Sequence, residues 1–177
     1  TTRKNLYNLL VKKLMLKTKI IYGLIGKRID YSFSKKYFNQ KFKVEGFINH
    51  SYENFDCKNL SQVLKVFKKK NIKGVNVTIP YKEKIIPYLD DISSEAKDIM
   101  AVNTVSFGKD GKLFGHNTDC HGFQKSLLEN LNKKVRNALV LGTGGASKAV
   151  RYILKKNYIN YKTVSRKKDK GDYTYKE

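Results

Sequence analysis

The stretch Ala138-Leu-Val-Leu-Gly-Thr-Gly-Gly-Ala-Ser147 decides the fold, because it has the pattern of a buried strand, a glycine turn and a helix start in that order. Gly142 permits the tight turn, and Gly144 lets the backbone approach a pyrophosphate at the positive end of the helix dipole. Ser147 takes the third glycine position of the motif and is still small. The stretch predicts a dinucleotide site, although a purely structural glycine turn would have the same sequence.

A second predicted strand, Tyr161–Ser165, follows at the distance expected for such a site and leads into Arg166 and Lys167. NAD enzymes usually place Asp or Glu here to hold the ribose hydroxyls, and a carboxylate would repel a 2′-phosphate. Arg166 can instead pair with that phosphate through two hydrogen bonds. Ser165, Arg166 and Lys167 therefore favour NADP, with ordinary solvated charges as the alternative.

Strand and helix signals alternate along the rest of the chain, which predicts an α/β architecture with mostly parallel sheets. A polar linker is expected at 133–137, before the glycine motif. The other predicted strands cover residues 20–25, 46–50, 74–79, 102–107 and 112–115. The predicted helices cover residues 34–44, 60–69, 80–88 and 93–100. Two more run from 118 or 119 to about 131 and from the glycine cluster at 142–145 to about 156.

A lysine stands at an unusual place in Asn76-Val-Thr-Ile-Pro-Tyr-Lys82. Asn76 and Thr78 share one face of a predicted strand, and Lys82 falls in the first turn of the helix expected after Pro80. A lysine at a helix N-terminus is electrostatically unfavourable, because the dipole there is positive. Another role would explain its presence, although a solvated lysine is the simpler explanation in a chain this basic.

Two further polar side chains lie at element boundaries. Asp119, in Asn117-Thr-Asp119, comes at a second strand–helix junction, where it could act in a site or cap its helix. Asn103 interrupts an apolar strand start, and a buried asparagine needs backbone or ligand partners. Both are candidate site residues, with a local structural role as the alternative.

Ser32 and Ser34 form either a capping pair, with Ser34 as the N-cap of the helix that follows, or a pair of hydroxyls that grips a carboxylate. His116, Cys120 and His121 lie close together in the sequence, but their spacing matches no familiar zinc site. No metal site is expected.

Composition fits a packed cytoplasmic protein. Of the 177 residues, 40% are hydrophobic and 29% charged, which argues against general disorder. No apolar run approaches the length of a membrane span, and the basic N-terminal stretch has no secretory cleavage site. Cys57 and Cys120 lie far apart, as expected of free thiols in a reducing compartment.

The formal net charge of +22 is open to three explanations. Lys and Arg could neutralise nucleic-acid phosphates, or could attract an anionic substrate or cofactor. Compositional drift is the third, because lysine greatly outnumbers arginine and is scattered along the chain rather than gathered in one stripe. Drift is favoured, and no nucleic-acid or membrane partner is expected.

Together and in this order, the segments from about Ile20 to Lys168 resemble those of shikimate dehydrogenases. The resemblance implies a substrate domain followed by a Rossmann-like NADP domain, with the active site in the cleft between them. Lys82 matches the catalytic lysine and Asp119 its partner. The residues that match substrate ligands are Ser32, Ser34, Thr78 and Asn103, and those that match the NADP loops are Gly142, Thr143, Gly144, Gly145, Ala146, Ser165, Arg166 and Lys167.

The resemblance further implies NADPH-dependent, reversible reduction of 3-dehydroshikimate to shikimate by a monomer or homodimer. The expected division is a basic extension (1–18), a substrate-binding and catalytic domain (19–117) and a partial NADP-binding domain (118–177). The chain departs from the family at Arg28, Tyr31 and Lys35, which puts the rigidity of that loop in doubt. Its cofactor domain is expected to lack the C-terminal part.

Two alternatives stay open. The first is a related oxidoreductase that accepts quinate or uses NAD. The second is a non-enzymatic, basic binding module that has kept the fold; such a module would show tight and steeply salt-dependent binding to nucleic acid.

Overall fold

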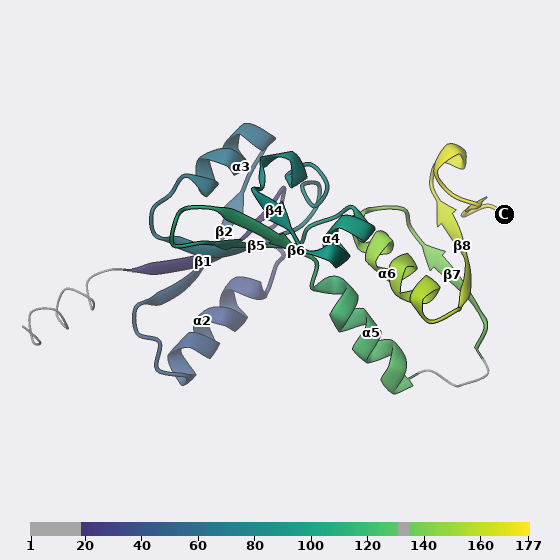
Figure 1. Ribbon diagram of the computed structural model, residues 1–177, viewed down its shortest axis with the longest axis horizontal. Helices are drawn as coiled ribbons and strands as arrows, with labels where there is room; N and C mark the ends of the chain where they lie inside the picture. The colour runs from purple at the N-terminus through teal and green to yellow at the C-terminus, as the bar shows by residue number, and fades with distance from the viewer. Residues whose placement is uncertain (1–18, 131–134) are drawn as a thin grey trace, which may run out of the picture.

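The computed structural model describes residues 19–130 and 135–177, which form two α/β lobes (Figure 1). The larger lobe contains a six-stranded sheet, and the smaller lobe contains a three-stranded sheet. The predicted α/β class is confirmed. The basic extension at 1–18 and the first part of the expected linker lie outside the described residues.

The larger sheet has the strand order β2-β1-β3-β5-β6-β4. Strand β1 pairs in parallel with both β2 and β3, and β4 pairs in parallel with β6. Strand β5 is antiparallel to β3 and to β6, and its pairing with β6 forms the expected hairpin. The strands are β1 (Ile20–Gly26), β2 (His50–Asp56), β3 (Ile72–Val77), β4 (Asp91–Ile92), β5 (Thr104–Phe107) and β6 (Leu113–His116).

Helices α2 (Ser34–Val44) and α3 (Leu60–Phe67) lie on opposite sides of this sheet, below and above it in Figure 1. On the α3 side the core is mostly aliphatic and includes the fully buried Ile25, Val63 and Val105. On the α2 side, Leu24, Ile29 and Tyr52 are buried against the aromatic rings of α2. Burial on both faces explains why β1 reads as a continuous apolar run.

The smaller lobe has the parallel strand order β7-β8-β9, with β7 (Asn137–Leu141), β8 (Asn160–Ser165) and β9 (Tyr173–Thr174). Helix α6 (Gly145–Lys156) connects β7 to β8 and buries Leu154 beside Val140. Its other side packs on α4 (Ser94–Ile99) and α5 (Asp119–Asn130), where Ile99, Cys120 and Ile153 are buried together. This apolar contact joins the lobes.

Three local predictions were wrong. The strand expected at 46–50 lies instead at β2, whose polar sequence has no clear alternation to reveal it. The helix expected after Pro80 is a run of turns that ends in a 3-10 turn, Ile86–Tyr88, because Pro87 has no N–H to donate to a carbonyl one turn back. Ser34 is the first helical residue rather than the N-cap, which is Phe33.

Candidate active site

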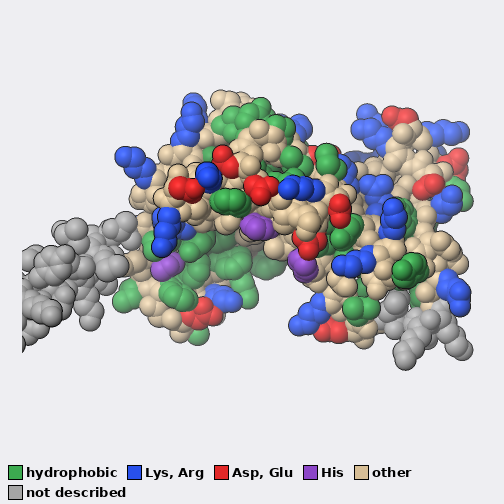
Figure 2. All heavy atoms as spheres, in the orientation of Figure 1, with side chains coloured by type: hydrophobic (Ala, Val, Ile, Leu, Met, Phe, Trp, Pro, Cys, Tyr) green, Lys and Arg blue, Asp and Glu red, His purple; other side chains and the backbone are tan. Residues whose placement is uncertain are grey.

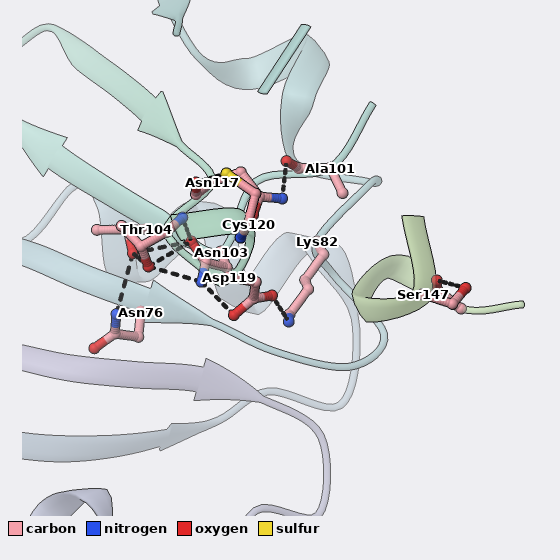
Figure 3. Close-up of polar contacts among 11 residues, drawn as sticks. Asn76, Lys82, Ala101, Asn103, Thr104, Asn117, Asp119, Cys120 and Ser147 are labelled. Atoms are coloured by element: carbon pink, nitrogen blue, oxygen red, sulfur yellow. Dashed lines mark hydrogen bonds and ion pairs between the residues drawn. The ribbon is translucent and has the colours of Figure 1, made fainter. Parts of the chain in front are cut away.

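Lys82 and Asp119 meet between the ends of two separate elements. Lys82 lies in the turns after β3, and Asp119 is the first residue of α5. The lysine Nζ is 2.6 Å from the aspartate Oδ2, in a charge-assisted hydrogen bond (Figure 3). The side chains are 16% and 34% exposed, so the pair is sheltered but reachable from solvent. The geometry combines a proton donor and an acceptor at one accessible place.

Asn117 accounts for the direction in which Asp119 points. Its Oδ1 accepts from the backbone N–H of Cys120 at 3.3 Å, which is the usual contact of a helix cap. Its Nδ2 donates to the Ala101 carbonyl at 2.9 Å and fixes this buried side chain. Because Asn117 makes the capping contact, the Asp119 carboxylate is available to face Lys82.

Asn103 holds the second oxygen of the same carboxylate. Its Nδ2 donates to Asp119 Oδ1 at 2.7 Å and to Thr118 Oγ1 at 2.9 Å. Its backbone is also paired, since its N–H donates to His116 and its carbonyl accepts from Val77. The predicted need of a buried asparagine for partners is thus met by backbone and side chains together, and Asp119 is held between an amide and an ammonium.

A cavity of about 540 Å³ separates this group from the smaller lobe. Its walls include Thr78 and Lys82 on one side and Gly144, Gly145 and Ala146 on the other. A Cβ on Gly145 would lie 3.2 Å from the Lys82 Cβ, so glycine permits this close approach of the lobes. Five of the residues predicted from sequence therefore line one cavity.

A second contact bridges the lobes beside this cavity. The Nζ of Lys148, on α6, lies 2.7 Å from a carboxylate oxygen of Glu83, next in sequence to Lys82. Both side chains are partly exposed, so the ion pair contributes at most about 1 kcal/mol. It nevertheless helps to set the glycine turn against the lysine.

The serine pair lies in the loop between β1 and α2. Ser32 Oγ donates to Ser34 Oγ at 3.1 Å and accepts from the Ser34 backbone N–H at 3.3 Å. The loop begins at the end of the sheet where Lys82 also lies, because β1 and β3 finish side by side there: the Thr78 N–H donates to the Ile25 carbonyl at the end of β1. Within the described residues no hydrogen bond links the serines to Asp119, so their role as substrate ligands stays a prediction.

The glycine turn has the form expected of an anion site. Gly142 has φ 118°, a conformation that favours glycine, and the first turn of α6 contains no acidic residue and no side-chain cap. A Cβ on Gly144 would meet nothing within 4 Å, so its backbone is open to a ligand. Ser147 Oγ donates to the Gly144 carbonyl at 2.7 Å, which steadies the turn. These features fit a dinucleotide pyrophosphate.

The end of β8 lies beside this turn. The buried Ser165 places its Oγ 3.4 Å from Thr143 Oγ1 and accepts from the Lys167 backbone N–H at 3.2 Å. The side chains of Arg166 and Lys167 are exposed and available to a solvent-facing phosphate. In the described part of the chain, no hydrogen bond or ion pair connects them to the Lys82 group.

Sequence reasoning missed Tyr52, Thr104 and Thr118 as parts of the polar network. Thr104 and Thr118 each bond to Asn103 Oδ1 at 3.1 Å. Tyr52, on β2, bonds to Asn76, on β3, across the intervening strand β1. Thr104 and Thr118 are next to Asn103 and Asp119 in the sequence, and this proximity could have identified them as candidate site residues. Tyr52 lies in a polar strand that gave no such signal.

The wider surface adds little to the site. Lys and Arg side chains are spread over both lobes on the face shown in Figure 2, rather than gathered in one stripe. Among residues 19–130 and 135–177, no group of three or more His, Cys, Asp or Glu could hold a metal, and no helix is long and apolar enough to cross a membrane.

Comparison with known families and proteins gives a consistent result. The family model described as the shikimate dehydrogenase substrate binding domain matches residues 24–105. A shikimate dehydrogenase (NADP(+)) of Clostridium beijerinckii is 46% identical over 154 residues, which is 82% of this chain and 55% of the relative. One from Methanosphaera stadtmanae is 42% identical over 85% of this chain and 53% of the relative.

The fold agrees with the sequence. The crystal structure of shikimate dehydrogenase 1 from Peptoclostridium difficile superposes with a TM-score of 0.79 at 36% identity, covering 89% of this chain and 61% of that one. The chain therefore spans a little over half the length of the relatives that it matches. Their similarity extends beyond the matched domain into the smaller lobe.

Proposed function

We propose that the protein is an NADP-dependent shikimate dehydrogenase, from the premise that residues 24–105 match the family model of the shikimate dehydrogenase substrate binding domain. Residues 19–117 would bind and convert the substrate, and residues 118–177 would bind NADP. The observation that supports this proposal best is the Lys82–Asp119 pair beside a cavity whose opposite wall is the glycine turn. A ketone and a nicotinamide could meet there.

The proposed reaction is the reversible reduction of 3-dehydroshikimate to shikimate. NADPH, when bound, supplies the hydride, and reduction of the ketone leaves negative charge on its oxygen. Lys82 donates the proton that neutralises this oxygen, and in the reverse direction its free amine accepts the proton from the hydroxyl. Asp119 orients the ammonium and hydrogen-bonds the reacting hydroxyl.

The remaining residues bind and orient. Ser32 and Ser34 hold the ring carboxylate through their hydroxyls, whereas Thr78 and Asn103 hold ring hydroxyls. Gly142, Thr143, Gly144, Gly145 and Ala146 hold the pyrophosphate with backbone N–H groups. Ser165, Arg166 and Lys167 hold the 2′-phosphate, which NAD lacks.

The proposal includes a cytoplasmic location, because both cysteines are free, buried thiols in separate clusters. A monomer or homodimer is expected, and this stays a prediction. No nucleic-acid partner is included, since the positive charge is dispersed over the face in Figure 2.

The test is a comparison of initial rates with paired substrates and cofactors. The protein is expressed with whatever coding sequence flanks the printed residues, and shikimate or quinate is oxidised with NADP or NAD. We expect shikimate with NADP to give the highest kcat/KM, at least about tenfold above shikimate with NAD. Higher activity with quinate or NAD would correct the substrate or cofactor.

A second outcome would overturn the proposal altogether. Duplex DNA binding that weakens steeply with salt, together with no turnover for any of the four pairs and no calorimetric binding of shikimate, would indicate a binding module instead.

A further inference from the structure

A chain of side-chain hydrogen bonds runs from a buried phenol to the carboxylate of Asp119 (its part from Asn76 onward is visible in Figure 3). The Tyr52 hydroxyl donates to Asn76 Oδ1 at 2.8 Å, and Asn76 Nδ2 donates to Thr104 Oγ1 at 3.2 Å. The Thr104 hydroxyl donates to Asn103 Oδ1 at 3.1 Å, and Asn103 Nδ2 donates to Asp119 Oδ1 at 2.7 Å. In each of these four bonds the donor is the residue that stands nearer to Tyr52 in the series.

One backbone group determines this direction. The Thr118 N–H, which can only donate, points at Asn103 Oδ1 at 2.8 Å. Oδ1 must therefore face Thr118 and Thr104, and Nδ2 must face Asp119. The Thr104 hydroxyl then donates to Asn103 and accepts from Asn76. The Thr118 N–H thus orients the Asn103 amide, and the Thr104 hydroxyl, by donating to Asn103, orients the Asn76 amide.

Tyr52 is held firmly at the start of the chain. Its residue is 3% exposed and its ring stacks on Phe38, with centroids 4.6 Å apart. Its backbone N–H and carbonyl both pair with the Asn39 side chain, at 3.0 and 2.9 Å. Burial raises the pKa of the Tyr52 phenol, so the group stays protonated and able to donate.

We propose that Tyr52, Asn76 and Thr104 are positioning residues, which fix the Asn103 amide and through it the Asp119 carboxylate. The inference rests on the proposed function, since it assigns these residues to the Lys82–Asp119 pair. Asp119 is one-third exposed, and without the Asn103 bond its carboxylate could rotate away from the ammonium. Aligned donors that end on an anion strengthen one another and stabilise its charge.

The first test removes single hydroxyls. Thr104→Val keeps the side-chain shape and deletes the donor; we expect kcat to fall about tenfold, with KM for NADPH unchanged, as for the loss of one aligned hydrogen bond. Tyr52→Phe acts from farther away, and kcat should fall about threefold. Thr104→Ser keeps the hydroxyl and should stay within about twofold of the parent.

Tyr81→Phe is the matched control for a lost tyrosine hydroxyl. Tyr81 is as buried as Tyr52, and its phenol donates to the Cys57 carbonyl at 2.6 Å, so it takes no part in the hydrogen-bond chain from Tyr52 to Asp119. We expect this variant to lose thermal stability as Tyr52→Phe does, yet to keep its kcat. Equal kcat values for Thr104→Val and Thr104→Ser, or parent kcat in Tyr52→Phe, would overturn the inference.

A second readout does not need turnover. In ¹⁵N NMR spectra, Tyr52→Phe should increase hydrogen exchange of the Asn103 side-chain amide at least about threefold, although two side chains separate the residues. Tyr81→Phe should leave that exchange unchanged. If the parent protein neither oxidises nor binds shikimate, the proposed function fails, while this measurement still tests the hydrogen-bond chain from Tyr52 to Asp119. An Asn103 amide indifferent to both variants would refute the inference.

Discussion

The two walls of the cavity between the lobes are built from different parts of the polypeptide. On the larger lobe the wall includes the side chains of Thr78 and Lys82, and Lys82 hydrogen-bonds to Asp119, which Asn103 holds in turn. On the smaller lobe, Gly144 and Gly145 present backbone. A side-chain wall can move a proton, whereas a glycine wall can receive a large anion closely. Substitutions in the two walls should therefore alter different kinetic constants.

The largest expected effect is on the side-chain wall. Lys82→Ala should lower kcat at least about 100-fold, because it removes the ammonium that Asp119 orients for proton transfer. The KM for NADPH should change little. Steady-state kinetics of the purified variant measures both constants. Lys109→Ala, at the exposed hairpin turn, is the control for loss of one positive charge. Near-parent kcat in Lys82→Ala would remove the lysine from the mechanism.

The next effect concerns cofactor choice. Arg166→Gln should lower the preference for NADP over NAD roughly 10- to 100-fold, since it removes a charged pair with the 2′-phosphate but no contact that NAD makes. The ratio of kcat/KM values for the two cofactors gives the answer. Lys168→Gln, two residues along, should change the ratio less than about twofold. An unchanged ratio in Arg166→Gln would mean that Arg166 is an ordinary solvated charge.

A smaller effect tests the glycine wall. Gly144 has an extended backbone with φ −82° and open space around its Cβ position, so Gly144→Ala should fold and lose at most a few degrees of thermal stability. The methyl group would obstruct the pyrophosphate, and KM for NADPH should rise about tenfold with kcat retained. Calorimetric titration and thermal melting measure the two quantities. Unchanged NADPH affinity would indicate a structural turn.

The smallest effect concerns the support of the glycine wall. A hydrogen bond from the Thr163 backbone N–H lowers the pKa of Asp172, which ties the end of the three-stranded sheet together. A carboxyl group whose pKa is lower in the folded state than in the unfolded state stabilises the fold at pH values above the ordinary aspartate pKa of about 4. This stabilisation is lost as the pH falls through the pKa of the folded state.

Asp172→Asn should therefore melt slightly below the parent at about pH 7 and together with it at about pH 2. Asp169→Asn controls for the loss of a negative charge. A melting difference that persists undiminished in acid would contradict the electrostatic explanation.

Elements with strong local signals were predicted well. The glycine stretch gave β7, the turn and α6, because an apolar run, glycines and helical spacing act over a few neighbouring residues. The hairpin of β5 and β6 followed from Gly108–Gly111 for the same reason. The helix after Pro80 was predicted from the position of that proline, and it failed because Pro87 interrupts the helical hydrogen bonds a few residues later.

The site was predicted in its residues but only partly in its contacts. Lys82, Asp119 and Asn103 were identified, yet nothing local to Asp119 distinguishes a cap from an ion-pair partner. Which of the two roles Asp119 takes depends on Asn117, because Asn117 makes the capping contact with α5 and leaves the Asp119 carboxylate free to pair with Lys82. Tyr52 could not be identified at all, because its partner Asn76 is 24 residues away in the sequence.

By itself, the sequence determined the α/β class, the glycine turn and the set of polar residues at strand ends, since each depends on short-range pattern. Only the tertiary structure decided that Lys82 faces Asp119 across 37 residues of chain, and that a line of donors from Tyr52 ends on the same carboxylate. The physical reason is that the direction of a side chain depends on which elements pack around it, and hydrogen-bonding capacity is assigned only when those elements meet.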